Sequence, residues 1–247
     1  MEIAVCINRV PDTGSRIDVQ NGIVDALRLN MVLNPYDEYA IEEAVRLKEL
    51  RAGLTVTAFS AGGKKRYDVL RKALAMGADQ VCLAEGGSNE DSYVVAASLC
   101  KAIRSHYSGL PDLVFCGRES SDSNRAQVPL MLAEMLGAAA VSDVTKLTMY
   151  EGGLRVWREI EGGVEEYMLY TPAVISTEKG LNVPRKTNIK AVMKARKQPV
   201  LHLDGSVEKT PGVLYRDFSP VSRERNCKFS ETAEDLVRML YKERRWG

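Results

Sequence analysis

Polar residues that could do chemistry are concentrated between Gly117 and Val128, where a predicted strand gives way to a predicted helix. In an open parallel sheet, ligands bind beyond the carboxyl ends of the strands, where helix N-termini offer unpaired N–H groups to anions. The same residues would also make a solvated loop with a helix cap, so the pattern alone leaves both interpretations open. The candidate contacts to the phosphate, hydroxyls or base of a nucleotide are Arg118, Ser121, Asp122, Asn124, Arg125 and Gln127.

Two further turns could contribute to the same site. Ser60-Ala61-Gly62-Gly63 follows a predicted strand, and glycines there let the backbone approach a phosphate or an adenosine. Many α/β proteins use such glycines only to make the turn. Asn34-Pro35-Tyr36-Asp37 precedes a predicted helix and is equally ambiguous, because Asn-Pro favours a turn and aspartate is a common helix cap.

The residue types give little support to side-chain catalysis or metal binding. The two histidines, His106 and His202, stand in no Ser-His-Asp, Cys-His or paired-carboxylate arrangement, and the sequence has no P-loop. No Cys-x-x-Cys pair occurs, which favours reduced structural thiols over a zinc or iron–sulfur site. The sequence therefore indicates a nucleotide-binding protein without catalytic side chains. Its cysteines are Cys6, Cys82, Cys100, Cys116 and Cys227.

Alternating strands and helices must position these residues. Strands are predicted at 3–7, 54–59, 81–84, 112–117 and 173–177, and helices at 37–50, 91–106 and 122–136, with another helix ending near Gly77. This order is typical of βαβ units and predicts an α/β fold, a Rossmann-like three-layer parallel sheet. Strands at 144–150, 154–160 and 164–170, separated by two Glu-Gly-Gly turns, predict an antiparallel hairpin extension.

The chain divides into a predicted α/β nucleotide-binding domain at 1–180 and a C-terminal arm at 181–247. Periodicity is weak in the arm until a last helix, which is predicted to begin at a Ser230 cap. An extended arm that ends in an amphipathic helix suits wrapping around a partner protein. The arm is interrupted by Pro184, Pro199, Pro211 and Pro220.

Local charge departs from balance at residues 185–197, which contain basic side chains and no acidic ones. Such a run could be a solvated face, or it could steer an acidic protein partner. It contains no aromatic residue for base stacking, which argues against nucleic acid. The basic residues are Arg185, Lys186, Lys190, Lys194, Arg196 and Lys197.

Composition excludes several classes of protein. Across 247 residues, 34 Lys and Arg balance 33 Asp and Glu, so no field of the whole molecule favours nucleic acid or a membrane surface. The N-terminus lacks the basic flank and apolar core of a signal peptide. No apolar run reaches the roughly 18 residues of a membrane-spanning helix. We expect a cytoplasmic protein with no direct membrane insertion.

Several motifs resemble the β subunit of electron transfer flavoproteins and follow that family's order over nearly the whole chain. Two of them, Ala73-Leu-Ala-Met-Gly-Ala-Asp and Asn182-Val-Pro-Arg leading to Met193-Lys-Ala, are unusual strings and make the resemblance specific. The others are Val10-Pro-Asp, the run from Asn34-Pro-Tyr-Asp to Lys48-Glu, Asp112-Leu-Val, Ala126-Gln-Val and the Glu-Gly-Gly hairpin with Val164-Glu-Glu.

The resemblance implies a heterodimer in which an α subunit holds a redox-active FAD and the β subunit covers it and binds an adenine nucleotide. That nucleotide is AMP in respiratory members and a second FAD in electron-bifurcating members, which use NADH and would add an oxidoreductase activity. The complex would carry electrons between dehydrogenases and a redox acceptor such as a quinone reductase. By position, the nucleotide would contact Cys6, Asn34, Pro35, Tyr36, Asp37, Ala61, Gly117, Arg118, Ser121, Asp122, Ser123, Asn124, Arg125, Ala126, Gln127 and Val128.

The resemblance also implies a recognition loop for partner dehydrogenases after Pro184, with Ile189 as its protruding aliphatic residue. In the nucleotide loop, residues 126–128 match bifurcating members, whereas Ser123, Arg125 and Pro129 depart from them. AMP and FAD both stay open for the β site, with FAD favoured. From the residues alone, the alternative is a stand-alone adenine-nucleotide-binding regulatory protein or an ATP-using enzyme on the same fold.

Overall fold

A nine-stranded sheet forms the centre of the computed structural model, which describes residues 1–86, 91–150, 152–208, 212–220 and 227–242. The strand order across the sheet is β11-β10-β9-β12-β8-β1-β6-β7-β13. The pairs β11–β10 and β10–β9 are antiparallel, and every later pair in this order, from β9–β12 to β7–β13, is parallel. The strands that carry the site are β1 (Glu2–Cys6), β6 (Thr55–Ala61), β7 (Gln80–Glu85), β8 (Leu113–Gly117) and β12 (Ala173–Thr177).

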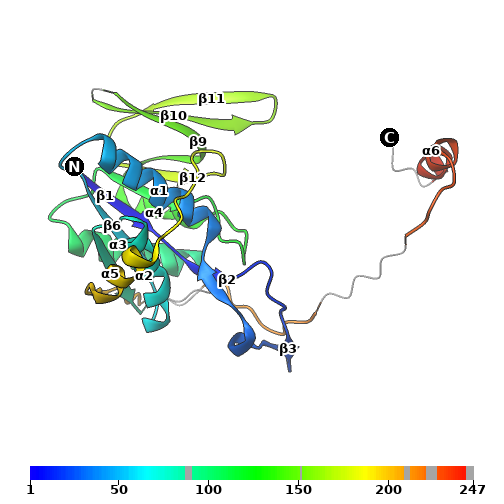
Figure 1. Ribbon diagram of the computed structural model, residues 1–247, viewed down its shortest axis with the longest axis horizontal. Coiled ribbons are helices and arrows are strands. Elements are labelled where there is room, and N and C mark those ends of the chain that lie inside the picture. The colour runs from blue at the N-terminus through cyan, green and yellow to red at the C-terminus, as the bar shows by residue number, and fades with distance from the viewer. Residues whose placement is uncertain (87–90, 151, 209–211, 221–226, 243–247) are drawn as a thin grey trace.

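Helices cover both faces of this sheet (Figure 1). α1 (Pro35–Leu50) and α2 (Tyr67–Met76) pack on one face, and α3 (Ser92–His106) and α4 (Val128–Leu136) pack on the other. Side chains along β1 alternate between the two faces of the sheet. Ile3 and Val5 belong to the hydrophobic core on one face, and Ala4 and Cys6 belong to the core on the other. The predicted α/β fold with a Rossmann-like three-layer arrangement is confirmed.

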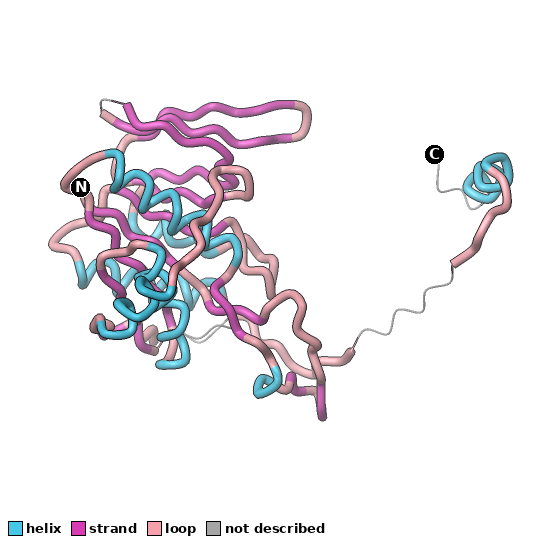
Figure 2. The backbone as a smooth tube through the Cα atoms, in the orientation of Figure 1, coloured by secondary structure: helices cyan, strands magenta, loops and turns pink. Residues whose placement is uncertain are grey.

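The antiparallel extension is built from β9 (Ala139–Tyr150), β10 (Gly153–Ile160) and β11 (Gly163–Leu169), and Figure 2 shows its strands reaching beyond the helices. The sequence predicted that this strand would begin at Val144. In the structure β9 begins at Ala139, because its first residues pair in parallel with β12. The rest of β9 continues into the hairpin with β10. One strand therefore belongs to both the parallel body and the extension.

An excursion between β1 and α1, which the sequence did not predict, adds two small antiparallel sheets. β2 (Arg9–Pro11) pairs with β5 (Met31–Leu33), and β3 (Val19–Gln20) pairs with β4 (Ile23–Val24). A short 3-10 helix, η1 (Ala26–Arg28), lies between them.

The predicted arm folds partly onto the body. α5 (Ile189–Lys197) packs against α2, and β13 (Leu201–Asp204) extends the central sheet in parallel beside β7. The sequence did not predict β13, because a four-residue edge strand with two apolar residues leaves almost no periodic signal. His202 helps to hold β13, since its ring nitrogens lie 2.6 Å from Tyr67 Oη and 2.8 Å from Glu85 Oε1.

The last helix, α6 (Ala233–Lys242), lies away from the body and has no buried residue (Figures 1 and 2). Its cap is Thr232 rather than the predicted Ser230, because the Asp235 N–H donates to Thr232 Oγ1 at 3.2 Å. Within the described parts of the chain, none of the helices is long and apolar enough to cross a membrane.

Candidate functional site

A pocket of about 800 Å³ opens at the carboxyl ends of β1, β6 and β8, which finish at Cys6, Ala61 and Gly117. The chain runs from β1 outward to β6 and β7 and then returns to β8 on the other side of β1. In open α/β sheets, ligands bind in the crevice at this reversal of strand order. The volume lies within the range of roughly 300–1,000 Å³ that is typical of small-molecule and cofactor sites.

Gly117 lets the end of β8 approach the start of α1. A Cβ on this residue would lie 2.7 Å from the carbonyl carbon of Tyr36 and 2.8 Å from the backbone nitrogen of Asp37. Any larger residue would push the strand and the helix apart. Glycine is therefore required by the packing of the pocket floor.

Asp37 is a buried carboxyl that joins three segments of this floor. It accepts hydrogen bonds from the backbone of Asn8 at 2.6 Å, from Asn34 Nδ2 at 2.9 Å and from the backbone of Gly117 at 3.1 Å. Burial raises the pKa of Asp37 to about 7, although these donors and the nearby Arg66 lower it. The carboxyl therefore changes charge near neutral pH.

Two asparagines fix the loop that follows β8. Asn34 Nδ2 donates to the carbonyl of Glu119 at 2.8 Å, and Asn34 Oδ1 accepts from the Ser121 N–H at 3.2 Å. Asn8 Nδ2 donates to Ser120 Oγ at 3.0 Å. The first half of the loop is thus held by side chains from the β5–α1 and β1–β2 connections.

Residues 118–127 form a loop, whereas the sequence predicted a helix from Asp122. Asn124 and Ala126 have φ values of 50° and 52°, in the left-handed region that interrupts a helix. α4 begins at Val128, with a proline in its first turn and Gly137 in a left-handed conformation after its end. The shortened helix places its N-terminus at the pocket, where Gln127 and Val128 are lining residues.

Arg66 lines the pocket from η2 (Lys64–Arg66), and the sequence did not single it out. It is 5% exposed, and its Nη1 donates to Asn8 Oδ1 at 2.8 Å and to Ser60 Oγ at 3.2 Å. It follows two lysines, so its local sequence resembles an exposed basic turn. The burial of Arg66 arises from tertiary packing and leaves no periodic signal.

Part of the predicted arm also lines this pocket. The Tyr215 and Phe218 rings stack with centroids 6.2 Å apart, and the Arg125 guanidinium lies 4.6 Å from the centre of the Tyr215 ring. The segment is attached at two points, where Phe218 N donates to the Gly22 carbonyl and Val213 N donates to Asp91, both at 3.0 Å. The arm was predicted to wrap a partner, yet residues 215–220 form a wall of this chain's own pocket.

The structure brings most of the predicted site residues to one pocket. Those that line it are Cys6, Asn34, Asp37, Ala61, Gly117, Arg118, Asp122, Ser123, Arg125, Ala126, Gln127 and Val128. The other four, Pro35, Tyr36, Ser121 and Asn124, belong to the same turns without lining it. Besides Arg66, the polar and aromatic lining residues that sequence reasoning missed are Asn8, Ser92, Glu119, Ser120, Tyr215, Phe218 and Ser219.

Arg118 lies at the rim of the pocket and is held by acidic residues. It forms ion pairs with Glu178 at 2.6 Å and with Asp143 at 3.2 Å. These contacts direct its guanidinium toward Asp143 within β9 and Glu178 just after β12. Arg118 therefore carries less available charge for a ligand than its position in the sequence suggests.

Titratable groups outside the pocket form no metal cluster within the described ranges, where groups of three or more His, Cys, Asp or Glu are not found together. His106 lies 3.8 Å from Cys82 Sγ and packs against Phe59, and burial lowers its pKa. Cys6, Cys82, Cys100 and Cys116 are buried free thiols, and Cys227 is exposed.

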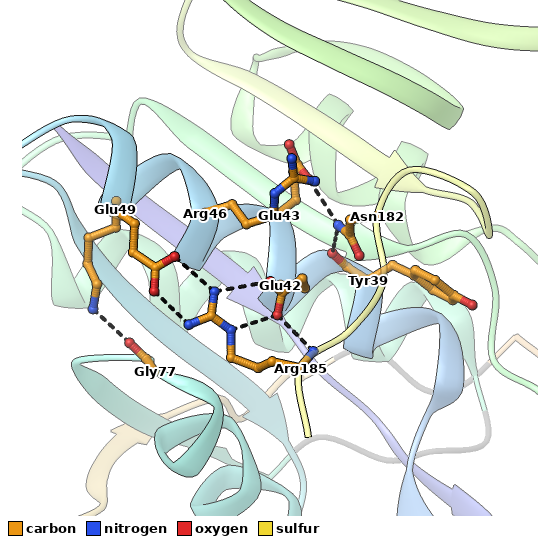
Figure 3. A network of polar contacts seen from close by, with 9 residues as sticks. Tyr39, Glu42, Glu43, Arg46, Glu49, Gly77, Asn182 and Arg185 are labelled. Carbon is orange, nitrogen blue, oxygen red and sulfur yellow. Dashed lines mark hydrogen bonds and ion pairs between the residues drawn. The ribbon is translucent and has the colours of Figure 1, made fainter. Parts of the chain in front are cut away.

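The basic run at 185–197 contains one residue that serves the fold. Arg185 binds Glu42 and Glu49 of α1, and Figure 3 shows its guanidinium between these two carboxylates. The nearest N–O distances are 2.8 Å to Glu42 and 2.6 Å to Glu49. Ile189, the predicted recognition residue, is the first residue of α5 and is 85% exposed.

The chain is similar to known proteins over most of its length. A family model described as the electron transfer flavoprotein domain matches residues 21–207. The electron transfer flavoprotein subunit beta of Syntrophomonas wolfei is 34% identical over 200 residues, covering 81% of this chain and 78% of the relative. That of Bradyrhizobium diazoefficiens is 31% identical over 249 residues and 98% of both chains.

A third relative carries a different name. The caffeyl-CoA reductase-Etf complex subunit CarD of Acetobacterium woodii is 31% identical over 238 residues, which cover 90% of this chain and 89% of the relative. Identity at this level across most of both chains, together with the domain match, establishes common ancestry. The chain belongs to the electron transfer flavoprotein β subunit family.

Proposed function

We propose that this chain binds an adenine nucleotide in the pocket at the ends of β1, β6 and β8. The observation that carries the proposal is the convergence of three separate turns, at Asn34–Asp37, Ala61 and Gly117–Val128, on a single cavity of about 800 Å³. The sequence predicts each of these turns as a candidate nucleotide contact. A solvated loop would not require the buried Asn34 and Asp37 network beneath it.

The residues of the pocket fit an adenine nucleotide in size and chemistry. Cys6, Ala61 and Gly117 leave a floor of small side chains for a flat base, and the N-terminus of α4 suits a phosphate. Arg66 and Arg125 add positive charge, and Ile17 and Val19 add an apolar side. These features support AMP or a second FAD as the ligand.

We further propose that the chain forms a heterodimer with an electron transfer flavoprotein α subunit that holds FAD at their interface. A bound flavin supplies the electron-transfer chemistry, and the residues of this chain position it and exclude water. α6 supports the heterodimer, because Leu236, Val237 and Tyr241 are 47%, 51% and 70% exposed and need a partner surface.

Docking of redox partners is proposed to use α5. Ile189 is an exposed aliphatic side chain beside the exposed Lys190, Lys194 and Lys197. A small apolar anchor within positive charge suits an acidic partner surface, because charge steers the encounter and the buried anchor adds affinity. Dehydrogenases and quinone reductases are the partner classes that fit this role.

The test is to co-express the chain with its α subunit, purify the complex, release the bound small molecules by heat and identify them. One FAD plus AMP for each heterodimer supports a simple electron carrier. Two FAD support electron bifurcation, for which NADH oxidation is then measured. A stable monomer that carries ATP and binds no flavoprotein partner would contradict the proposal.

A further inference from the structure

Three polar side chains outside the nucleotide pocket form a continuous chain of hydrogen bonds. Tyr67 is the first residue of α2, His202 lies in β13, and Glu85 is the last residue of β7. Tyr67 Oη lies 2.6 Å from His202 Nε2, and His202 Nδ1 lies 2.8 Å from Glu85 Oε1. The three groups therefore make a hydroxyl–imidazole–carboxylate relay, which we call the Tyr67 relay.

Glu85 determines where the protons of the Tyr67 relay lie. An ionised carboxylate can only accept hydrogen bonds, so Nδ1 of the neutral His202 ring carries the ring proton. Nε2 is then an acceptor, and the Tyr67 hydroxyl donates to it. The imidazole is thus placed to take the phenolic proton, and the carboxylate of Glu85 stabilises the imidazolium that results.

The Tyr67 relay exceeds what the attachment of β13 requires. β13 pairs in parallel with β7 from Leu201 to Asp204, and the preceding α5 packs on α2. Sites of nucleophilic chemistry combine a nucleophile, a base within about 2.6–3.2 Å of it and a third group that orients the base. Tyr67, His202 and Glu85 supply these three parts in that order.

The surroundings favour negative charge on the phenol and leave the relay open to small molecules. The Arg71 guanidinium lies one helical turn along α2, 5.7 Å from the centre of the Tyr67 ring, and its positive charge stabilises a phenolate. Tyr67 packs partly against the hydrophobic core, which restricts the orientations of its ring. The side chains of His202 and Glu85 are 39% and 50% exposed, so a reagent in solution can reach them.

We propose that Tyr67 is an acyl acceptor, with His202 as its general base and Glu85 as the positioning residue that orients this base. The substrate class is a small carboxylic acid derivative with a good leaving group. The phenolic oxygen attacks the carbonyl carbon, the bond from that carbon to the leaving group breaks, and the phenolic proton passes to His202 Nε2. The imidazolium then gives this proton to the departing group. The product is an ester on Tyr67, so the relay is a site of covalent modification.

The test is acetylation of the full-length chain by N-acetylimidazole at neutral pH, with the ester at each tyrosine followed by peptide mass spectrometry. Tyr241 is the internal reference, because it is 70% exposed and lies on α6, away from the body that carries the relay. General-base assistance contributes about 10²- to 10⁴-fold in enzymes, so Tyr67 should react at least about 10-fold faster than Tyr241. Exposure alone predicts the opposite order, since Tyr67 is partly buried.

His202→Gln tests the base. An amide can keep a hydrogen bond to the Tyr67 hydroxyl but cannot take its proton. This variant should acetylate Tyr67 at least about 10-fold more slowly than the wild type and leave the rate at Tyr241 unchanged. A role of His202 limited to holding β13 would not produce this loss, because the hydrogen bond is retained.

Glu85→Gln tests the positioning residue, and Asp68→Asn is its matched control. Glu85→Gln should also slow acetylation of Tyr67, because the imidazolium loses the carboxylate that stabilises it. Asp68 is next to Tyr67 in the sequence, and its carboxylate pairs with Arg9 at 2.7 Å instead of with the relay. Asp68→Asn removes the same charge and should leave the rate at Tyr67 unchanged.

Two results would overturn the inference. One is a wild type in which Tyr67 reacts no faster than Tyr241. The other is a His202→Gln variant that acetylates Tyr67 at the wild-type rate. Thermal unfolding reports whether His202→Gln is folded, and if it is not, the wild-type comparison and Glu85→Gln decide between the two outcomes.

Discussion

At the scale of single residues, Asp37 couples the pocket to pH. Its carboxyl is protonated more readily in the folded chain than in the unfolded chain, because burial raises the pKa from 3.8 to about 7. The folded state therefore binds more protons between these values, and its stability falls as pH rises through about 7. The hydrogen bonds that Asp37 accepts from Asn8, Asn34 and Gly117 hold the pocket floor over the same range.

We expect Asp37→Asn to remove this pH dependence. Between pH 5 and pH 7, the wild type should lose about 2 kcal/mol of unfolding free energy from this group, which the amide variant should not lose. We expect Asp37→Asn to be less stable than the wild type at every pH, since its NH₂ group faces a hydrogen-bond donor. The difference in unfolding free energy between the two proteins should narrow as pH rises, because only the wild type loses stability. Urea unfolding of both proteins from pH 5 to pH 8 measures the difference. A deficit that is constant with pH would contradict the raised pKa of Asp37.

At the scale of elements, the sequence predicted the alternating core better than the polar loops. The helical spacing of the apolar residues Ala40, Ile41 and Ala44 predicts α1. The continuous apolar run at residues 113–117 predicts β8 as a buried strand. The predicted start of α4 at Asp122 was wrong, because the left-handed conformations of Asn124 and Ala126 depend on contacts made by the folded loop. α5 and β13 were missed because their stability comes from packing on α2 and β7.

The contact between the segment at 181–197 and α1 gives an element-scale prediction. Arg185→Ala should cost about 2 kcal/mol, because it leaves the carboxylate of Glu42 buried and unpaired. The cost stays below the roughly 3–5 kcal/mol of a fully buried pair, since the Arg185 side chain is 31% exposed. Urea unfolding gives the loss, and hydrogen exchange should quicken in the amides of residues 181–197.

Arg46→Ala is the matched control for this experiment. Arg46 is 47% exposed and makes a single ion pair with Glu43 at 3.3 Å, while Glu43 keeps its hydrogen bond from Asn182. We expect a loss below about 1 kcal/mol for this variant. Equal losses in the two variants would show that Arg185 has no special role in attaching the segment (Figure 3).

The exposed end of α5 gives a second prediction at this scale. Ile189→Ala should leave flavin content intact and slow electron delivery to a partner dehydrogenase about 10-fold at subsaturating concentrations, as expected for an interface anchor. Stopped-flow absorbance measures the rate. Ile160→Ala, at a 43% exposed position on β10, should transfer electrons at the wild-type rate. Unchanged transfer in Ile189→Ala would remove α5 from the docking surface.

At the scale of the whole molecule, the body and α6 should be separable. A chain ending at Pro220 keeps the pocket wall at 215–220 and loses a helix that has no buried residue. The truncated chain should retain its unfolding midpoint and bind the proposed nucleotide, yet less α subunit should co-purify with it. Leu236→Ser with Val237→Ser in the full chain should reproduce the loss of α subunit without truncation. Full recovery of the α subunit by both variants would contradict a role for α6 in the heterodimer.

The pocket lining draws on residues from Cys6 near the start of the chain to Pro220 near its end. A ribosome that is making this protein therefore exposes the first strand long before the last wall of the cavity has been translated. The N-terminal half can begin to fold as it emerges, but the enclosed cavity forms only after synthesis is almost complete. Binding of the proposed nucleotide should therefore require an almost complete polypeptide, since a prematurely terminated chain lacks the pocket wall at residues 215–220.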